Sequence, residues 1–116
     1  MALKQFTRVM KALSDPNRVK ILKMLQRKMM CVCEIQASLD IAQPTVSKHL
    51  KVLEDAGLVG FQKSGQWVNY HLAEASDNPY SATLLDNLSQ WLLDDPEVKR
   101  LMAAVETANR EVICRK

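Results

Sequence analysis

The sequence predicts a mainly α-helical chain with one small β-hairpin, and two features of its apolar pattern support this prediction. Over most of the chain, apolar residues recur every three or four positions, which is the spacing of one face of an α-helix. Over 58–72 the pattern instead alternates on both sides of a short turn, as in paired strands. At 116 residues the chain can build one core and is too short for two.

The N-terminal part of the sequence predicts two helices that meet at Asp15-Pro16. The first runs over about 3–14, and its apolar stripe comprises Phe6, Val9, Met10 and Leu13. Asp15 then serves as N-cap of the second helix and Pro16 as its first residue. Arg27-Lys28 closes that helix with positive charge, which suits a helix C-terminus. Its expected buried residues are Val19, Leu22 and Leu25.

A short helix, a tight turn and a longer helix follow. Residues 29–32 form an apolar connection, and the short helix is expected over about 33–39. A turn at 40–42 leads to a helix over about 43–56, which Gly57 ends as a C-terminal glycine does.

The hairpin and a C-terminal helical region complete the chain. Strand-like segments at 58–63 and 66–72 flank Ser64-Gly65, the expected two-residue turn. Helical spacing returns over about 79–113, where Asp95-Pro96 repeats the cap-and-proline signal.

The order of these elements defines the fold class. A helix-turn-helix over about 33–56, followed by a two-stranded hairpin at 58–72, is the winged helix-turn-helix arrangement. We therefore expect residues 1–116 to form one DNA-binding domain with no internal repeat or linker.

The helix over 43–56 has an apolar face and a polar face. At about 100° per residue, Val46, Leu50 and Leu53 share the buried side, and two lysines lie opposite. Lysines contact phosphates or guanine, and Gln, Thr and Ser in the first turns can bond base edges. The alternative, that the lysines only solvate a surface helix, is outweighed by the neighbouring hairpin. The predicted DNA-contacting residues are Gln43, Thr45, Ser47, Lys48, Lys51 and, near the hairpin tip, Lys63 and Gln66.

The two histidines are expected to be packed, hydrogen-bonded residues at the edge of the core. His49 lies on the flank of the buried helix face, and His71 lies on the second strand. Neither has a second histidine at the helical spacing that a zinc site requires.

Composition and charge narrow the class of protein. With 47% hydrophobic and 25% charged residues, the chain has an ordinary globular composition. The apolar runs are far too short to span a membrane, and the N-terminus has no signal-peptide core, so we expect a cytoplasmic protein with no membrane partner. The net charge of +3 allows a polyanionic partner without requiring one.

Cys31-Val32-Cys33 is the most informative motif. Three cysteines are too few for a disulfide scaffold, so reduced thiols are expected. Neighbouring thiolates suit soft ions, and a helix N-terminus favours the thiolate form. In a regular helix the two side chains diverge by about 200° and cannot share one ion, whereas in an extended or unwound segment entering the helix they can come closer. Binding of one ion to both should therefore distort the start of the short helix. The alternative is a pair of small buried apolar residues.

Four segments of the sequence resemble the ArsR/SmtB family of winged-helix repressors, namely 14–18, 31–34, 43–50 and 65–72. The Cys-x-Cys followed by an acid is most similar to the arsenic-responsive repressors of arsenical-resistance operons. The resemblance implies a non-enzymatic homodimer that binds double-stranded operator DNA and is joined through its N- and C-terminal helices. Here these helices are the regions at about 3–14 and 79–113.

The resemblance also implies an inducer and its ligands. DNA binding requires no cofactor, and As(III) or Sb(III) releases the operator by binding Cys31 and Cys33. In three-cysteine sites of the family the third sulfur comes three residues after the second, where this chain has Gln36. Two thiolates with a non-protein ligand could serve, or Cys114 could supply the third sulfur. The alternative for Cys114 is a surface thiol at a fraying helix end.

Two alternatives stay open. The thiols could respond to cadmium, lead or oxidants, although the family's cadmium and lead sensors have cysteines in an N-terminal arm and this chain has none before Cys31. The family's zinc sensors use a final-helix histidine site, and no histidine follows His71 here. A thiol-based metalloid-binding protein without a DNA function is less favoured, because it would not need the lysine-bearing helix and wing.

Overall fold

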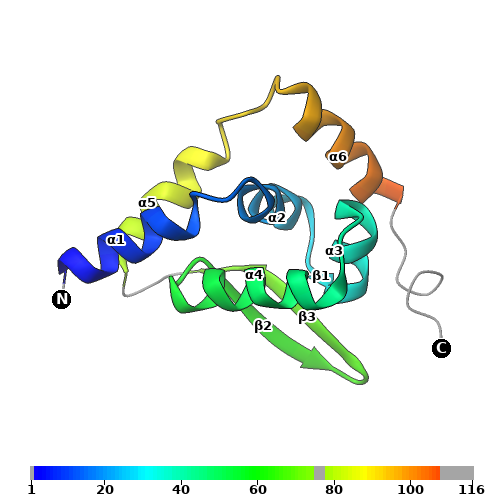
Figure 1. The fold of residues 1–116 in the computed structure, drawn as a ribbon, viewed down its shortest axis with the longest axis horizontal. Coiled ribbons are helices and arrows are strands. Elements are labelled where there is room, and N and C mark those ends of the chain that lie inside the picture. The colour runs from blue at the N-terminus through cyan, green and yellow to red at the C-terminus, as the bar shows by residue number, and fades with distance from the viewer. Residues whose placement is uncertain (1, 75–77, 108–116) are drawn as a thin grey trace.

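Helix α2 (Pro16–Arg27) lies at the centre of the molecule, and the other elements pack around it (Figure 1). The computed structural model describes residues 2–74 and 78–107. Its other elements are α1 (Ala2–Ala12), β1 (Met30–Cys31), α3 (Val32–Leu39), α4 (Gln43–Asp55), β2 (Val59–Ser64), β3 (Trp67–Leu72), α5 (Pro79–Leu88) and α6 (Pro96–Thr107). The fold is the mainly helical winged helix-turn-helix that the sequence predicts. Among the described helices, none is long and apolar enough to cross a bilayer.

The junction between α1 and α2 confirms the predicted cap. Asp15 Oδ1 accepts hydrogen bonds from the backbone N–H groups of Asn17 at 2.8 Å and Arg18 at 3.4 Å. Pro16 occupies the first turn, where its missing N–H costs nothing. Behind this cap, α2 supplies much of the core with Ile21, Leu22, Met24 and Leu25.

Helices α3 and α4 form the helix-turn-helix. Helix α3 begins one residue earlier than predicted, with Cys31 as its N-cap. Helix α4 ends where Gly57 takes a left-handed conformation (φ 78°), which glycine adopts without steric cost. The N–H of Gly57 donates to the Glu54 carbonyl at 3.0 Å. The N–H of Leu58 donates to Leu53 at 3.0 Å, which completes a Schellman motif and turns the chain into the hairpin.

The sheet has three antiparallel strands in the order β1-β3-β2, whereas the sequence predicts only two. Strand β1 pairs Met30 with Tyr70 and Cys31 with Asn69. The segment predicted as a plain apolar connection is therefore hydrogen-bonded to the wing. This pairing places Cys31 on β1, at the edge of the sheet.

The hairpin turn lies one residue later than predicted. Ser64 pairs with Trp67, so the loop residues are Gly65 and Gln66 rather than Ser64-Gly65. Gly65 has φ 61°, and a glycine at the first loop position suits a tight two-residue turn. Strand β2 likewise begins at Val59, one residue after the predicted start.

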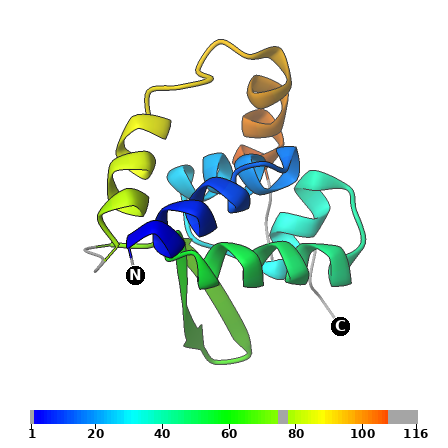
Figure 2. The ribbon, with the colours of Figure 1, turned by 60° about the vertical axis from the view of Figure 1, so that its left-hand side comes forward.

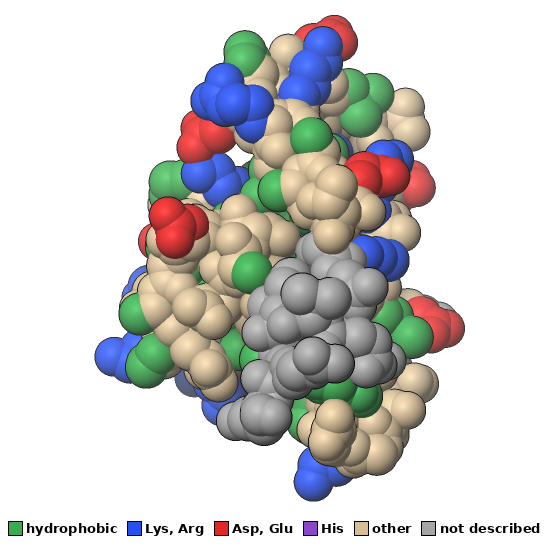
Figure 3. All heavy atoms as spheres, turned by 90° about the vertical axis from the view of Figure 1, so that its right-hand side faces the viewer, with side chains coloured by type: hydrophobic (Ala, Val, Ile, Leu, Met, Phe, Trp, Pro, Cys, Tyr) green, Lys and Arg blue, Asp and Glu red, His purple; other side chains and the backbone are tan. Residues whose placement is uncertain are grey.

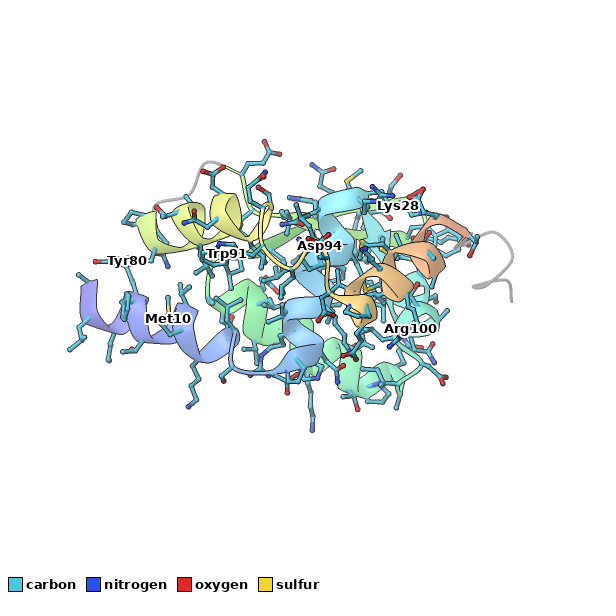
Figure 4. All side chains as sticks on the ribbon, turned by 90° about the horizontal axis from the view of Figure 1, so that it is seen from above. Met10, Lys28, Tyr80, Trp91, Asp94 and Arg100 are labelled. Atoms are coloured by element: carbon cyan, nitrogen blue, oxygen red, sulfur yellow. The ribbon has the colours of Figure 1, made fainter. Side chains whose placement is uncertain are left out.

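The C-terminal region divides into two helices that pack on different parts of the molecule. Helix α5 lies beside α1, whereas α6 crosses α2 and α3 (Figures 1 and 4). Asp95 caps α6 as predicted, since its Oδ2 accepts from the N–H of Val98 at 3.0 Å. The apolar stripe of α6 is buried within the chain and consists of Val98, Leu101 and Val105.

The apolar stripe of α6 is packed within the chain, and the expectation that the 79–113 region serves dimerisation stays a prediction. Its apolar residues already contact α2 and α3 of the same chain, and the ion pairs Lys20–Glu97 and Arg27–Glu106 join α6 to α2. Among the described residues of α1 and of the segment 89–95, large apolar side chains stay exposed, namely Leu3, Phe6, Met10, Trp91, Leu92 and Leu93. Residues 108–113 lie outside the described part of the chain.

Lys23 is a buried lysine that holds the end of α5. Its side chain is 3% exposed, and its Nζ donates to the carbonyl oxygens of Leu88 and Trp91, both at 2.9 Å. Burial lowers the pKa of Lys23. The cation lies where carbonyl groups at a helix C-terminus lack helical partners.

We expect Lys23→Met to lower the free energy of unfolding by about 1–3 kcal/mol, because methionine fills the space but removes the donor from two buried carbonyls. Lys20→Met is the matched control, since its partly exposed ion pair with Glu97 contributes about 0–1 kcal/mol. Chemical denaturation followed by circular dichroism measures both. Identical unfolding midpoints for Lys23→Met and the wild type would contradict this role.

Candidate nucleic-acid interface and thiol site

Helix α4 turns a polar face to solvent. Val46, Leu50 and Leu53 are buried, as predicted, and fix the rotation of the helix about its axis. Every α4 residue predicted to contact DNA is consequently exposed, and these residues are Gln43, Thr45, Ser47, Lys48 and Lys51.

The hairpin extends away from the helical body next to α4 (Figures 1 and 2). Lys63 lies near its tip, opposite Val68, and Gln66 is the second loop residue. Both Lys63 and Gln66 are exposed, as an element that contacts the DNA backbone requires. The structure thus leaves all seven predicted DNA-contacting side chains accessible on two neighbouring elements.

The charges around α4 differ from those around α6. Lys51 has a partner on its own helix, because its Nζ lies 3.4 Å from Asp55 Oδ1. Lys48 and Lys63 are exposed on α4 and on the wing. The face on which α6 ends instead carries basic and acidic side chains side by side in its upper part (Figure 3). A mixed face of this kind has little attraction for a polyanion.

His49 and Arg18 connect α4 to the end of α1. Arg18 Nη1 lies 3.3 Å from His49 Nδ1, and Asp15 Oδ1 lies 4.0 Å from His49 Nε2. The Nε of Arg18 donates to the Ala12 carbonyl at 2.7 Å. His49 is therefore the hydrogen-bonded edge residue that the sequence predicts. His71, half-buried with Nδ1 2.9 Å from the Leu72 carbonyl oxygen, has the same character.

The structural role of Arg18 was missed from the sequence. The contact between Arg18 and His49 joins residues 31 positions apart, so no local pattern indicates it. The sequence offered only the place of Arg18 in the 14–18 segment that resembles the family.

Cys31 and Cys33 lie at the junction of β1 and α3, and neither forms a disulfide in the described part of the chain. Cys31 is extended (φ −85°, ψ 168°) and 3% exposed, whereas Cys33 lies in the first turn of α3 and is half-buried. Glu34 completes a capping box with Cys31. Its Oε1 accepts from the Cys31 N–H at 3.0 Å, and its own backbone N–H donates to the Cys31 sulfur.

The protonation of Cys31 differs from the sequence-based expectation of a thiolate at a helix N-terminus. Burial raises the pKa of Cys31, and the nearby charge of Glu34 raises it further. The hydrogen bond from the Glu34 backbone lowers that pKa by less than burial raises it, but by more than the charge of Glu34 raises it. Together these effects favour the protonated thiol over the thiolate at Cys31.

A third sulfur for the site is not among the described residues. Within 2–74 and 78–107, no three His, Cys, Asp or Glu side chains are grouped so that they could hold a metal ion. Gln36 occupies the next turn of α3, and Cys114 lies outside the described part of the chain. The thiol site that the structure describes is the pair Cys31 and Cys33.

Comparisons with known proteins agree with this fold. Residues 15–60 match the family described as bacterial regulatory protein, arsR family. The arsenic resistance transcriptional regulator ArsR1 of Pseudomonas putida is 33% identical over 91% of this chain and 84% of its own. The arsenical resistance operon repressor of Escherichia coli is 30% identical over 85% of this chain and 83% of its own.

A solved structure shows the same fold. The homodimeric winged helix-turn-helix DNA-binding domain Mb0332 of Mycobacterium bovis, a possible ArsR-family regulator, superposes with a TM-score of 0.65. The two proteins are 28% identical over 76% of this chain and 78% of that one.

The exposed polar helix, the projecting hairpin and the matched family together define a DNA-binding transcriptional regulator, a class of protein that is not enzymatic. The chain belongs to the arsR family of bacterial regulatory proteins.

Proposed function

We propose that this regulator is a repressor that binds operator DNA as a homodimer and releases it when As(III) or Sb(III) binds Cys31 and Cys33. The position of the two thiols at the start of α3 is the observation that carries the proposal. Helix α3 packs against α4, whose exposed side includes Lys48. Relatives named for arsenical resistance favour arsenic as the inducer.

The chemistry of capture is a condensation without a change of oxidation state. Two thiols and As(OH)₃ form two As–S bonds, two As–O bonds break, and each hydroxide leaves as water with a thiol proton. The third arsenic position keeps its hydroxide, or Cys114 takes it with loss of a third water. Soft thiolates are the ligands that such ions prefer.

The burial of the thiols sets the order of events. The half-buried Cys33 is the accessible first contact, and the buried Cys31 follows when the start of α3 opens. Arsenic at the Cys31 sulfur replaces the hydrogen bond from the Glu34 N–H and removes the N-cap of α3. A changed start of α3 shifts its packing against α4 and lowers operator affinity.

Fluorescence anisotropy on labelled operator DNA tests the proposal. Under anaerobic conditions we expect arsenite to dissociate the complex, and Cd(II) or peroxide to have little effect. Release by Cd(II) or peroxide alone would favour the corresponding sensor of the same fold. Stable complexes under all three treatments would contradict any sensing role of the thiols.

The proposed homodimer uses an apolar surface of α1 and α5. Leu3, Phe6 and Met10 of α1 are 74%, 42% and 38% exposed. Phe6 contacts Tyr80 at the start of α5, with ring centroids 5.4 Å apart, and Figure 4 shows the two helices side by side. An apolar groove of about 340 Å³ lies near them, lined by Leu13, Val19, Leu84, Leu88, Trp91 and Leu92. An exposed apolar surface of this kind is typical of an interface.

We expect Met10→Glu to raise the dimer dissociation constant by about tenfold or more, because it places a charge inside an apolar contact. Operator affinity should fall with it, since two linked reading helices bind more tightly than one. Arg8→Glu, on the opposite exposed side of α1, is the control. Analytical ultracentrifugation measures both, and an unchanged dimer in Met10→Glu would exclude this surface.

A further inference from the structure

The thiol site is connected to the wing as well as to the helix-turn-helix. Cys31 is the last residue of β1 and also the N-cap of α3. Strand β1 pairs with β3, which is the central strand of the sheet and forms the wing hairpin with β2. A change in the backbone at Cys31 therefore reaches both DNA-contacting elements.

We propose that binding of a trivalent metalloid to Cys31 and Cys33 opens the pairing of β1 with β3 and thereby releases the wing from its DNA-contacting position. This inference rests on the proposed function. It adds a second route of induction beside the contact between α3 and α4.

The lengths of the strand pairs explain why β1 is the part that opens. Strand β1 has two residues, fewer than strands normally have, and pairs with β3 at only two positions. Strands β2 and β3 pair at six positions, from Val59–Leu72 to Ser64–Trp67. Local opening favours the region with the fewest interactions, so the hairpin stays intact while its attachment to β1 is lost.

The side chain of Cys31 is directed to the same sheet face as that of its partner Asn69, because directly paired residues share a face. Asn69 is 7% exposed, and Trp67 follows on that face two residues away. Cys33 lies instead on the first turn of α3. An ion that joins both sulfurs ties Cys31 to the first turn of α3, and in this proposal that link displaces Cys31 relative to Asn69.

The wing amplifies a small change at its base. Six residues per strand span roughly 20 Å, with Lys63 and Gln66 at the far end. A small tilt where β3 meets β1 therefore moves these two side chains farther than it moves Asn69.

Amide hydrogen exchange of the full chain, with and without arsenite, tests the inference. We expect exchange at the β3 amides that face β1 to rise at least several-fold when arsenite binds, while amides between β2 and β3 keep their protection. Cys33→Ser should show no such rise. Mass spectrometry identifies the protein that carries the arsenic adduct. If this protein has left its operator but its β3 amides exchange as before, the wing route alone is overturned. Absence of the adduct would overturn the proposed function and this inference with it.

A thermodynamic cycle provides a second measurement. Lys63→Ala removes a wing contact, so it should weaken operator binding of the free protein more than that of the arsenite-treated protein. The ratio of the dissociation constant with arsenite to that without arsenite should then be several-fold smaller in Lys63→Ala than in the wild type. Equal weakening in both states, with the ratio unchanged, would show that the wing does not respond to the inducer.

Discussion

We expect Cys31→Ser or Cys33→Ser to leave operator binding near that of the wild type and to abolish release at the arsenite concentrations that release the wild type. Each variant keeps one thiol of the pair, and the arsenite concentration for half-release should rise by about 100-fold or more because the second thiolate of the pair no longer binds intramolecularly. Cys31→Ser should retain the structure, since serine is a favourable N-cap residue at the position that Cys31 occupies. Anisotropy titrations with operator DNA measure both affinity and release.

Cys114→Ser provides the matched control for this prediction. If two protein thiolates suffice, its release curve coincides with that of the wild type. If Cys114 supplies the third sulfur, the curve shifts to higher arsenite concentration but less than in Cys31→Ser. Normal release in either Cys31→Ser or Cys33→Ser would exclude the thiol pair as the sensor.

Lys48→Ala is expected to weaken operator binding at every sequence tested and to reduce the dependence on salt. Removal of one phosphate contact lowers the slope of log K against log salt by about 1, and a symmetric dimer loses two such contacts. Lys51→Ala should have a smaller effect, because Lys51 is already paired with Asp55 at 3.4 Å. Neither variant should alter arsenite uptake, since both lysines lie on the exposed side of α4.

Lys99→Ala controls for net charge. Lys99 lies on α6, 4.0 Å from Asp94, and its substitution removes the same charge as Lys48→Ala. If Lys99→Ala lowered affinity as much as Lys48→Ala, the effect would come from overall charge rather than from α4. Unchanged binding in both α4 variants would place the reading surface elsewhere.

The elements with a strong local pattern were predictable from the sequence. Helix α4 alternates buried and exposed residues with the helical period, and Val46, Leu50 and Leu53 are buried as expected. The caps at Asp15 and Asp95 also follow from local chemistry, because an aspartate followed by proline starts a helix in both places.

Strand β1 could not be predicted in the same way. A strand of two residues is too short to show an alternating apolar pattern. The pairing of Cys31 with Asn69 also joins positions far apart in the chain. The partner of the α6 stripe is equally non-local. A buried apolar face shows that a contact exists but not whether α2, α3 or a second subunit provides it.

The protonation of Cys31 illustrates the limit of local reasoning at the thiol site. The position at a helix N-terminus favours a thiolate, and this much is visible in the sequence. Burial of the same thiol acts in the opposite direction and is the larger effect, yet it depends on packing by the whole fold.

In the proposed dimer, Arg18 places a geometric constraint on the operator. Its guanidinium joins the end of α1, through the Ala12 carbonyl, to His49 on α4. In a dimer built on α1, this linkage sets the separation of the two reading helices and hence the number of base pairs between half-sites. Insertion of one base pair at the centre of the operator should therefore change the binding affinity of the wild type and of Arg18 variants to different extents.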